Sequence, residues 1–162
     1  MNWLKAHFRK HRQRKPWDFC WKVAIEGVIV SIIPAVILVG LVNQSERSFT
    51  NEPLGKMLLL ILVLAPVLET LLFQTLPIGV ARLFKAGFKA QVLASTIPFA
   101  AAHMLEGVTV GICAGLIGGF YLAFTYAHWK DKSTWKALWV TTLSHFIRNS
   151  FCAVVLIIAE AS

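Results

Sequence analysis

Four polar side chains lie inside apolar stretches of the chain, where they could carry out chemistry. Glu69 lies in "LAPVLETLLFQT", His103 ends "FAAAH", and His145 and Asn149 begin and end "HFIRN". An acidic residue at the centre of a membrane span costs roughly 2.5–3.5 kcal/mol on insertion scales, so such residues usually face the protein interior and serve a function. A carboxylate with two imidazoles suits general acid–base catalysis, a zinc site or a proton path.

Helical spacing decides which of these side chains can act together. His145 and Asn149 are four residues apart, so they share one helix face about one turn from each other. Glu69 and Gln74 are five apart, roughly 140° around a helix, so both cannot point at one spot. We therefore expect Gln74 to orient the carboxylate from the side or to bond a neighbouring helix.

The elements that must position these residues are long apolar blocks. Hydrophobic residues make up 57% of the chain and charged residues 15%, whereas a soluble domain has about 25% charged residues. Four blocks reach or approach the ~20 residues that cross a hydrocarbon core about 30 Å thick, and a fifth is shorter. The four are residues 23–42, 57–80, 107–127 and 137–159, and the fifth is 89–105. The sequence predicts an all-α, polytopic helical membrane protein with about five transmembrane helices.

Straight spans would place the candidate residues at similar depths. Glu69 would lie roughly 18 Å from the outer face, and His103 and His145 roughly 20 Å and 12 Å from the inner face, at a rise of about 1.5 Å per residue. All three fall in the middle third of the hydrocarbon core, so side chains from three different helices can meet there.

Positive charge follows the loops. Seven Lys or Arg residues precede residue 23, and the loops 81–89 and 128–136 carry three each, whereas residues 43–56 have two, offset by two glutamates. This alternation is the positive-inside pattern and predicts a cytoplasmic N-terminus and an external C-terminus. The net charge of +8 therefore indicates contact with anionic lipid rather than nucleic acid. We expect a multi-pass protein of a cell membrane, and the compact size favours a bacterial inner membrane.

The start of the chain is basic and contains three tryptophans. We expect residues 1–22 to lie along the interface as a leader, with Trp3, Trp17 and Trp21 as anchors. The apolar run that follows is longer than that of a signal peptide, so residues 23–162 are expected to form one membrane domain.

Three glycines, Gly111, Gly115 and Gly119, recur every four residues in the apolar block 107–127. Small residues at this spacing let a neighbouring helix approach closely, so we interpret them as a packing surface rather than a ligand site. The three cysteines lie singly and are expected to be packing residues without a disulfide framework.

In order and spacing, "APVLETLLFQ", "FAAAH" and "HFIRN" resemble the three motifs of the CPBP family of CAAX-protease and bacteriocin-processing (Abi) intramembrane proteases. The family pattern is approximately E-E-x-x-x-R, then F-x-x-x-H, then H-x-x-x-N/D. The first motif here is a variant, E-T-x-x-x-Q, with Glu69 kept, Thr70 in place of the second glutamate and Gln74 in place of the arginine. The two neutral residues replace what resembles an acid–base pair, which avoids a single buried, unpaired charge.

The resemblance implies hydrolysis of a peptide bond in a protein or peptide substrate, without a metal. Glu69 would be the general base for a water molecule, which His103 would hold or polarise. His145 and Asn149 would donate hydrogen bonds to the oxyanion that forms on the scissile carbonyl. Supporting positions are Thr70, Gln74 and Phe99, the last one turn before His103.

Other interpretations stay open on the residues alone. Glu69, His103 and His145 are also a possible ligand set for catalytic zinc, although no H-E-x-x-H occurs. The chain could also be a non-catalytic family member, such as a bacteriocin-immunity or membrane scaffold protein. A proton-path or transport protein is a further alternative, but the five blocks show no inverted repeat. The sequence indicates neither the substrate nor the oligomeric state.

The predicted orientation can be tested with reporter fusions. Because Lys and Arg alternate between loops, fusions after residue 47 and at Ser162 should both read as external. A cytoplasmic signal at Ser162 would remove one crossing from the predicted topology.

Overall fold

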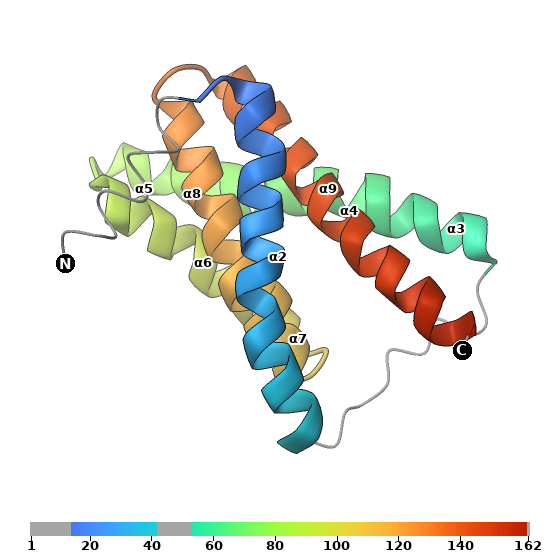
Figure 1. Ribbon diagram of the computed structural model, residues 1–162. Helices are drawn as coiled ribbons and strands as arrows, with labels where there is room; N and C mark the ends of the chain where they lie inside the picture. Colours follow the sequence, from blue (N-terminus) through green and yellow to red (C-terminus); the bar gives the residue numbers. More distant parts are fainter. Residues whose placement is uncertain (1–13, 42–52, 162) are drawn as a thin grey trace.

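The computed structural model describes residues 14–41 and 53–161, in which all regular structure is helical (Figure 1). The segments, with η for π-helix, are α2 (Pro16–Leu41), α3 (Leu54–Leu59), η1 (Leu60–Leu64), α4 (Ala65–Glu69), η2 (Thr70–Thr75), α5 (Leu76–Leu83), α6 (Phe88–Met104), α7 (Val108–Val110), η3 (Gly111–Gly118), α8 (Gly119–Lys130) and α9 (Thr134–Ala161). The segments from α3 to α5 form one continuous rod, here named the Glu69 helix (residues 54–83). Those from α7 to α8 form another. The five rods confirm the predicted all-α fold.

Three of the five rods are long and apolar enough to cross a membrane, by length and composition of the described residues: Pro16–Leu38, Leu54–Leu83 and Val108–Lys130. Of the other two, α6 has 17 residues and α9 has 28. The protein is thus a polytopic helical membrane protein, as predicted. The direction of insertion stays a prediction.

The first helix begins at Pro16, before the expected start of the first span at residue 23. Proline is favoured in the first turn of a helix, where its missing N–H is not needed. Phe19 is fully buried, whereas Trp17 and Trp21 are exposed. Residues 16–22 therefore form the first turns of α2, and Trp3 lies outside the described residues.

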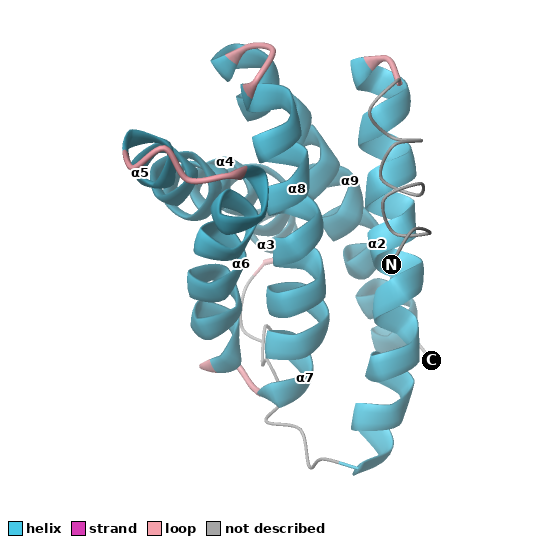
Figure 2. Ribbon diagram, turned by 90° about the vertical axis from the view of Figure 1, so that its left-hand side faces the viewer, coloured by secondary structure: helices cyan, strands magenta, loops and turns pink. Residues whose placement is uncertain are grey.

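The Glu69 helix crosses the bundle steeply. Figure 1 shows it running across behind α2 and α8, and Figure 2, turned by 90°, shows it nearly end-on. The depth expected for Glu69 assumed parallel spans, whereas this helix is tilted relative to the others. The level of Glu69 is set instead by the point at which its helix crosses α9.

Two π-helical segments widen the Glu69 helix on either side of α4. η1 precedes Ala65 and Pro66, and η2 precedes Leu76 and Pro77. In an α-helix a proline ring clashes with the carbonyl four residues earlier, and the proline lacks an N–H. The wider π turn moves that carbonyl away from the ring. Glu69 consequently ends a short α-helical segment held between two widened turns, a geometry that is frequent at functional sites.

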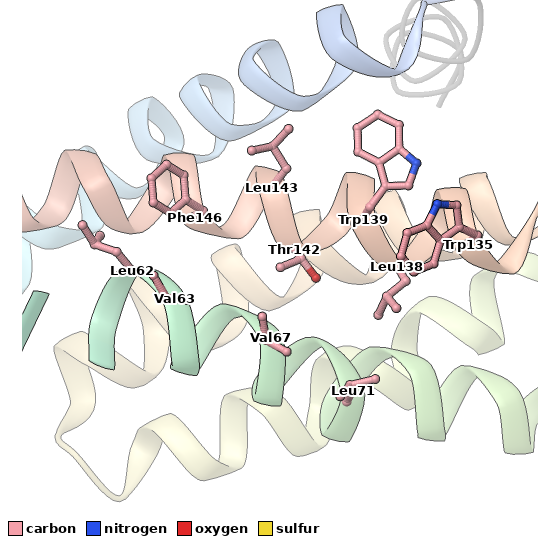
Figure 3. A pocket seen from close by; sticks show the side chains of 10 residues that line it. All are labelled: Leu62, Val63, Val67, Leu71, Trp135, Leu138, Trp139, Thr142, Leu143 and Phe146. Atoms are coloured by element: carbon pink, nitrogen blue, oxygen red, sulfur yellow. The ribbon is translucent and has the colours of Figure 1, made fainter. Parts of the chain in front are cut away.

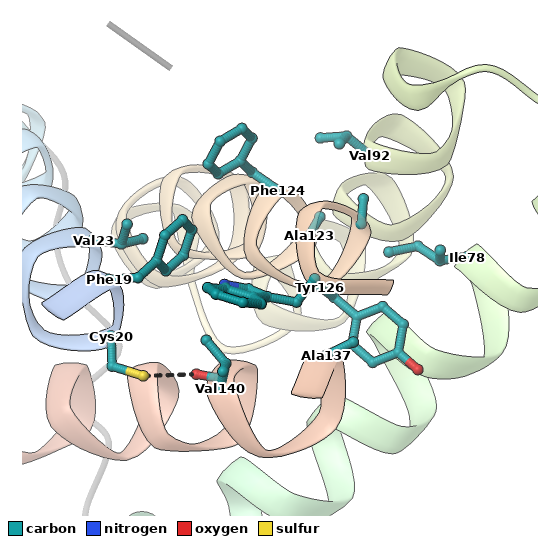
Figure 4. Packing of buried hydrophobic residues seen from close by; sticks show 12 residues of the cluster. Phe19, Cys20, Val23, Ile78, Val92, Ala123, Phe124, Tyr126, Ala137 and Val140 are labelled. Carbon is teal, nitrogen blue, oxygen red and sulfur yellow. Dashed lines mark hydrogen bonds between the residues drawn. The ribbon is translucent and has the colours of Figure 1, made fainter. Parts of the chain in front are cut away.

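The apolar core draws on the start of α2, the end of α8 and the start of α9, with side chains from α5 and α6 (Figure 4). Phe19 stacks on Phe124 and His128 with ring centroids 6.2 and 5.4 Å apart. The Cys20 thiol donates to the Val140 carbonyl at 3.6 Å. Cys20 is thus a buried packing residue, and the cysteines of the described part of the chain are free thiols. This core joins the ends of three helices. Glu69, His103, His145 and Asn149 are not part of it.

The glycine stripe packs against α6, which confirms the predicted packing surface. A Cβ on Gly115 would lie 2.9 Å from the Cα of Ala100 and the Cβ of His103. A Cβ on Gly119 would lie 2.7 Å from a ring carbon of Phe99. Both distances are shorter than real Cβ contacts, so only glycine lets α6 sit this close to the 108–130 rod. The stripe therefore positions the face of α6 that carries His103.

Gly115→Ala should destabilise the protein, because the methyl group would press on the backbone of α6. Overpacking of this kind costs typically 1–3 kcal/mol. We expect a lower unfolding temperature in detergent than for wild type. Gly79→Ala is the matched control, since a Cβ there meets nothing within 4 Å. Equal unfolding temperatures for the two variants would show that α6 can shift without cost.

Candidate active site

Glu69 and His145 come together from two rods far apart in the sequence. The Oε2 atom of Glu69 and the Nε2 atom of His145 are 3.6 Å apart. This distance is too long for a hydrogen bond but within the range of an ion pair when the imidazole is protonated. The His145 side chain is 5% exposed and that of Glu69 is 26% exposed. The Glu69 side chain is therefore partly exposed although its Oε2 atom is buried, while the imidazole is enclosed.

Phe99 links the two histidines. Its ring lies 4.3 Å from the His103 ring and 6.1 Å from the His145 ring, measured between centroids. Phe73, on η2 of the Glu69 helix, packs on its edge at 5.4 Å. One buried aromatic ring on α6 thus separates and fixes two imidazoles from different helices. The structure therefore brings Glu69, His103 and His145 into one neighbourhood.

The tautomer of His103 follows from its backbone contact. The Nδ1 atom of His103 lies 3.0 Å from the carbonyl oxygen of Phe99. A carbonyl oxygen only accepts, so Nδ1 carries the hydrogen, and in the neutral ring Nε2 is an acceptor. Only Nε2 of His103 is therefore left to act on another group.

Asn149 is bound to the Glu69 helix. Its Nδ2 atom donates to the carbonyl of Ile61 at 2.9 Å. That carbonyl is available because the N–H of Ala65 bonds the carbonyl of Leu60, five residues back. In the same register the donor for Ile61 would be residue 66, which is proline and has no N–H. Asn149 thus supplies the hydrogen bond that Pro66 cannot, and its second amide hydrogen remains for another acceptor.

Thr70 and Gln74 lie on the buried face of the Glu69 helix. With Pro66 and Ile78 they form a stripe of fully buried residues at every fourth position. Neither the hydroxyl of Thr70 nor the amide of Gln74 has a hydrogen-bond partner among the described residues. Gln74 therefore does not orient the Glu69 carboxylate directly.

Arg148 had no role assigned from its sequence position, yet it is a major polar contact of the bundle. Its guanidinium donates to the hydroxyl of Ser31 at 2.9 Å and to the carbonyl of Cys113 at 2.6 Å. It ties α2 and η3 to α9, three residues after His145. A Cβ on Gly27 or Gly118 would lie 3.0 Å from it. The signal available in the sequence was an arginine inside an apolar block. Glycines in two other apolar blocks, Gly27 and Gly118, leave space for its side chain.

An apolar groove of about 460 Å³ lies between the Glu69 helix and α9 (Figure 3). Val67 and Leu71 line one side, and Trp139, Thr142 and Phe146 line the other. These residues flank Glu69 and His145 on the same two helices. The groove and the polar pair therefore lie between the same two helices, and the groove has a size typical of ligand pockets.

The described residues contain no group of three His, Cys, Asp or Glu side chains arranged to hold a metal ion. The zinc alternative, with Glu69, His103 and His145 as ligands, would therefore need these side chains to rearrange. The contact present is between a carboxylate and an imidazole.

Comparison with known proteins gives the family. The family model described as "Type II CAAX prenyl endopeptidase Rce1-like" matches residues 52–151. The chain belongs to this family. The matched stretch contains Glu69, His103, His145 and Asn149, and membership confirms the predicted resemblance to CAAX-type intramembrane proteases. Neither among curated proteins nor among solved structures was a match found.

Asn149→Ala should destabilise the protein, because the Ile61 carbonyl loses its donor. Leaving a fully buried acceptor unsatisfied costs about 1–3 kcal/mol, and this partly buried carbonyl should cost an amount near the lower end. We expect a lower unfolding temperature in detergent. Ser150→Ala is the control, since the hydroxyl of Ser150 bonds only within its own helix, to the carbonyl of Phe146. An unchanged unfolding temperature for Asn149→Ala would mean that the interhelical bond contributes nothing.

Proposed function

We propose that the protein is an intramembrane endopeptidase that hydrolyses a peptide bond of a protein or peptide substrate with a water molecule activated by Glu69. The contact between the Glu69 carboxylate and the His145 imidazole, 3.6 Å apart within a CAAX-type protease family, carries this proposal. Burial from bulk water strengthens electrostatic interactions at such a site.

The reaction needs a base, a site for the oxyanion and a proton for the leaving group. Glu69 takes a proton from water, and the resulting hydroxide forms a bond to the carbonyl carbon of the substrate. The carbonyl oxygen becomes an oxyanion. The C–N bond then breaks as the proton held by Glu69 passes to the leaving nitrogen.

The side chains near Glu69 would position the water molecule and stabilise the oxyanion. His145 faces the carboxylate, which favours a role on the same water molecule rather than on the oxyanion alone. His103 presents only Nε2, which can accept from the water or, when protonated, donate to the oxyanion. The second amide hydrogen of Asn149 is the further oxyanion donor. The groove between the same two helices would receive an apolar part of the substrate.

Glu69→Gln should abolish cleavage without loss of the protein. The amide keeps the size of the side chain but cannot take a proton from water, and losing a general base costs typically 10²–10⁴-fold in rate. A neutral amide is also cheaper to bury than a carboxylate, so the protein level should be unchanged or higher. The measurement compares the N- and C-termini of membrane proteins in cells with wild type and with the variant.

Glu106→Gln is the matched control, because Glu106 is an exposed glutamate in the turn after α6. It should leave the set of new termini unchanged. Identical termini in cells with wild type and with Glu69→Gln would contradict the proposal and favour a non-catalytic scaffold. Loss of cleavage in membranes treated with a zinc chelator would contradict the metal-free mechanism and favour zinc held by Glu69, His103 and His145.

A further inference from the structure

Five polar side chains on the Glu69 helix and on three neighbouring helices are buried in an unusual environment. Each is fully buried, and each has side-chain polar atoms without a hydrogen-bond partner in the described part of the chain. They are Thr70 and Gln74 on η2, Ser95 on α6, Tyr126 on α8 and Thr141 on α9. Buried polar groups in proteins are almost always bonded to protein or to ordered water, so such a set calls for a partner.

The register of the Glu69 helix and α6 places Ser95 about one turn from Gln74. These two helices are antiparallel. Arg82 bonds Gln91 at 3.4 Å at one end, and Phe73 packs on Phe99 at 5.4 Å at the other. Positions between those two contacts must lie opposite each other in order. Ser95, one turn before Phe99, is therefore level with the turn of the Glu69 helix that follows Gln74.

Thr141 and Tyr126 approach the same turn from the other two helices. On α9, Asn149 bonds Ile61 and His145 meets Glu69, so Thr141, one turn earlier, lies beyond Glu69 in the direction of η2 and α5. Helix α9 and η2 are in contact. Tyr126 belongs to the same core cluster as Ile78, the next residue of the buried stripe after Gln74. Figure 4 shows its hydroxyl at the far end of the ring, on the side of the Glu69 helix.

We propose that Thr70, Gln74, Ser95, Tyr126 and Thr141 form a buried site for ordered water directly behind Glu69. The chemistry of the site selects this ligand. Four hydroxyls and one amide offer both donors and acceptors and carry no charge, so they suit a small neutral molecule that both donates and accepts. A buried water needs two to four polar partners, which a set from four helices supplies.

The position of the site gives it two consequences. Thr70 directly follows Glu69 in the chain, so water bound to its hydroxyl lies roughly 100° around the helix from the Glu69 side chain. Water bridging Gln74 to α6, α8 and α9 also links the Glu69 helix to its three neighbours at the level where its own backbone is widened. That this water takes part in hydrolysis rests on the proposed function, whereas its presence does not.

The test is X-ray radiolytic footprinting of the full chain in detergent, in water labelled with ¹⁸O. Radicals formed from bound water oxidise the side chains next to it, whatever their exposure to bulk solvent. Tyr126 should be labelled several-fold faster than Phe19, an aromatic residue of the same core that is also fully buried. Labelling of Tyr126 as slow as that of Phe19 would overturn the proposal.

Gln74→Leu provides the second arm, because it removes two of the unpartnered atoms. Labelling of Tyr126 should fall several-fold, with unchanged elution on size exclusion. If this variant does not fold, Ser95→Ala replaces it with the same expectation. Unchanged labelling in the folded variant would exclude its side chain from the site. Since the readout needs no cleavage, a failure here is separate from failure of the proposed protease activity.

Discussion

A carboxylate inside an apolar helix must meet a partner, and the rest of the structure depends on how Glu69 does so. Its partner, His145, is on α9, so the Glu69 helix has to cross α9 at this point. Pro66 and Pro77 make that geometry possible, because each follows a π-helical segment that widens the helix. The widening frees the Ile61 carbonyl, and Asn149 binds it one turn from His145. The same two helices thus share the polar contact and the bond that fixes their crossing.

The second imidazole depends on a different constraint, the close approach of α6 to the 108–130 rod. Gly115 and Gly119 allow this approach, which places Phe99 and His103 against a backbone that has no side chains there. Phe99 then contacts both histidines. A change far from the reacting groups, such as a methyl group on the glycine stripe, would therefore move His103 relative to Glu69. The packing at Gly115 and Gly119 is therefore coupled to the acid–base groups through the ring of Phe99.

Much of this could be predicted from the sequence, because apolar length and helical spacing are local properties. They predicted the five helices, the glycine packing surface and the contact of Glu69 with His145. The steep crossing and the π segments could not be predicted, since they depend on how proline strain is relieved when two particular helices pack. The partner of Asn149 is a backbone carbonyl, which no side-chain pattern can show. Arg148 likewise bonds a serine and a carbonyl on other helices, so its role appears only in three dimensions.

The neutral residues at positions 70 and 74 change the electrostatics of the site in a definite direction. A guanidinium at position 74 would have been buried on the face that packs against α6, α8 and α9, where removing charge from water costs several kcal/mol unless a paired acid compensates. Thr70 and Gln74 remove both charges and leave a requirement for hydrogen bonds instead. The buried guanidinium of the described chain lies on α9, at Arg148, and is held by Ser31 and the Cys113 carbonyl on the side of α2 and η3. Glu69 thus faces an imidazole on α9, and positions 70 and 74 of its own helix are neutral.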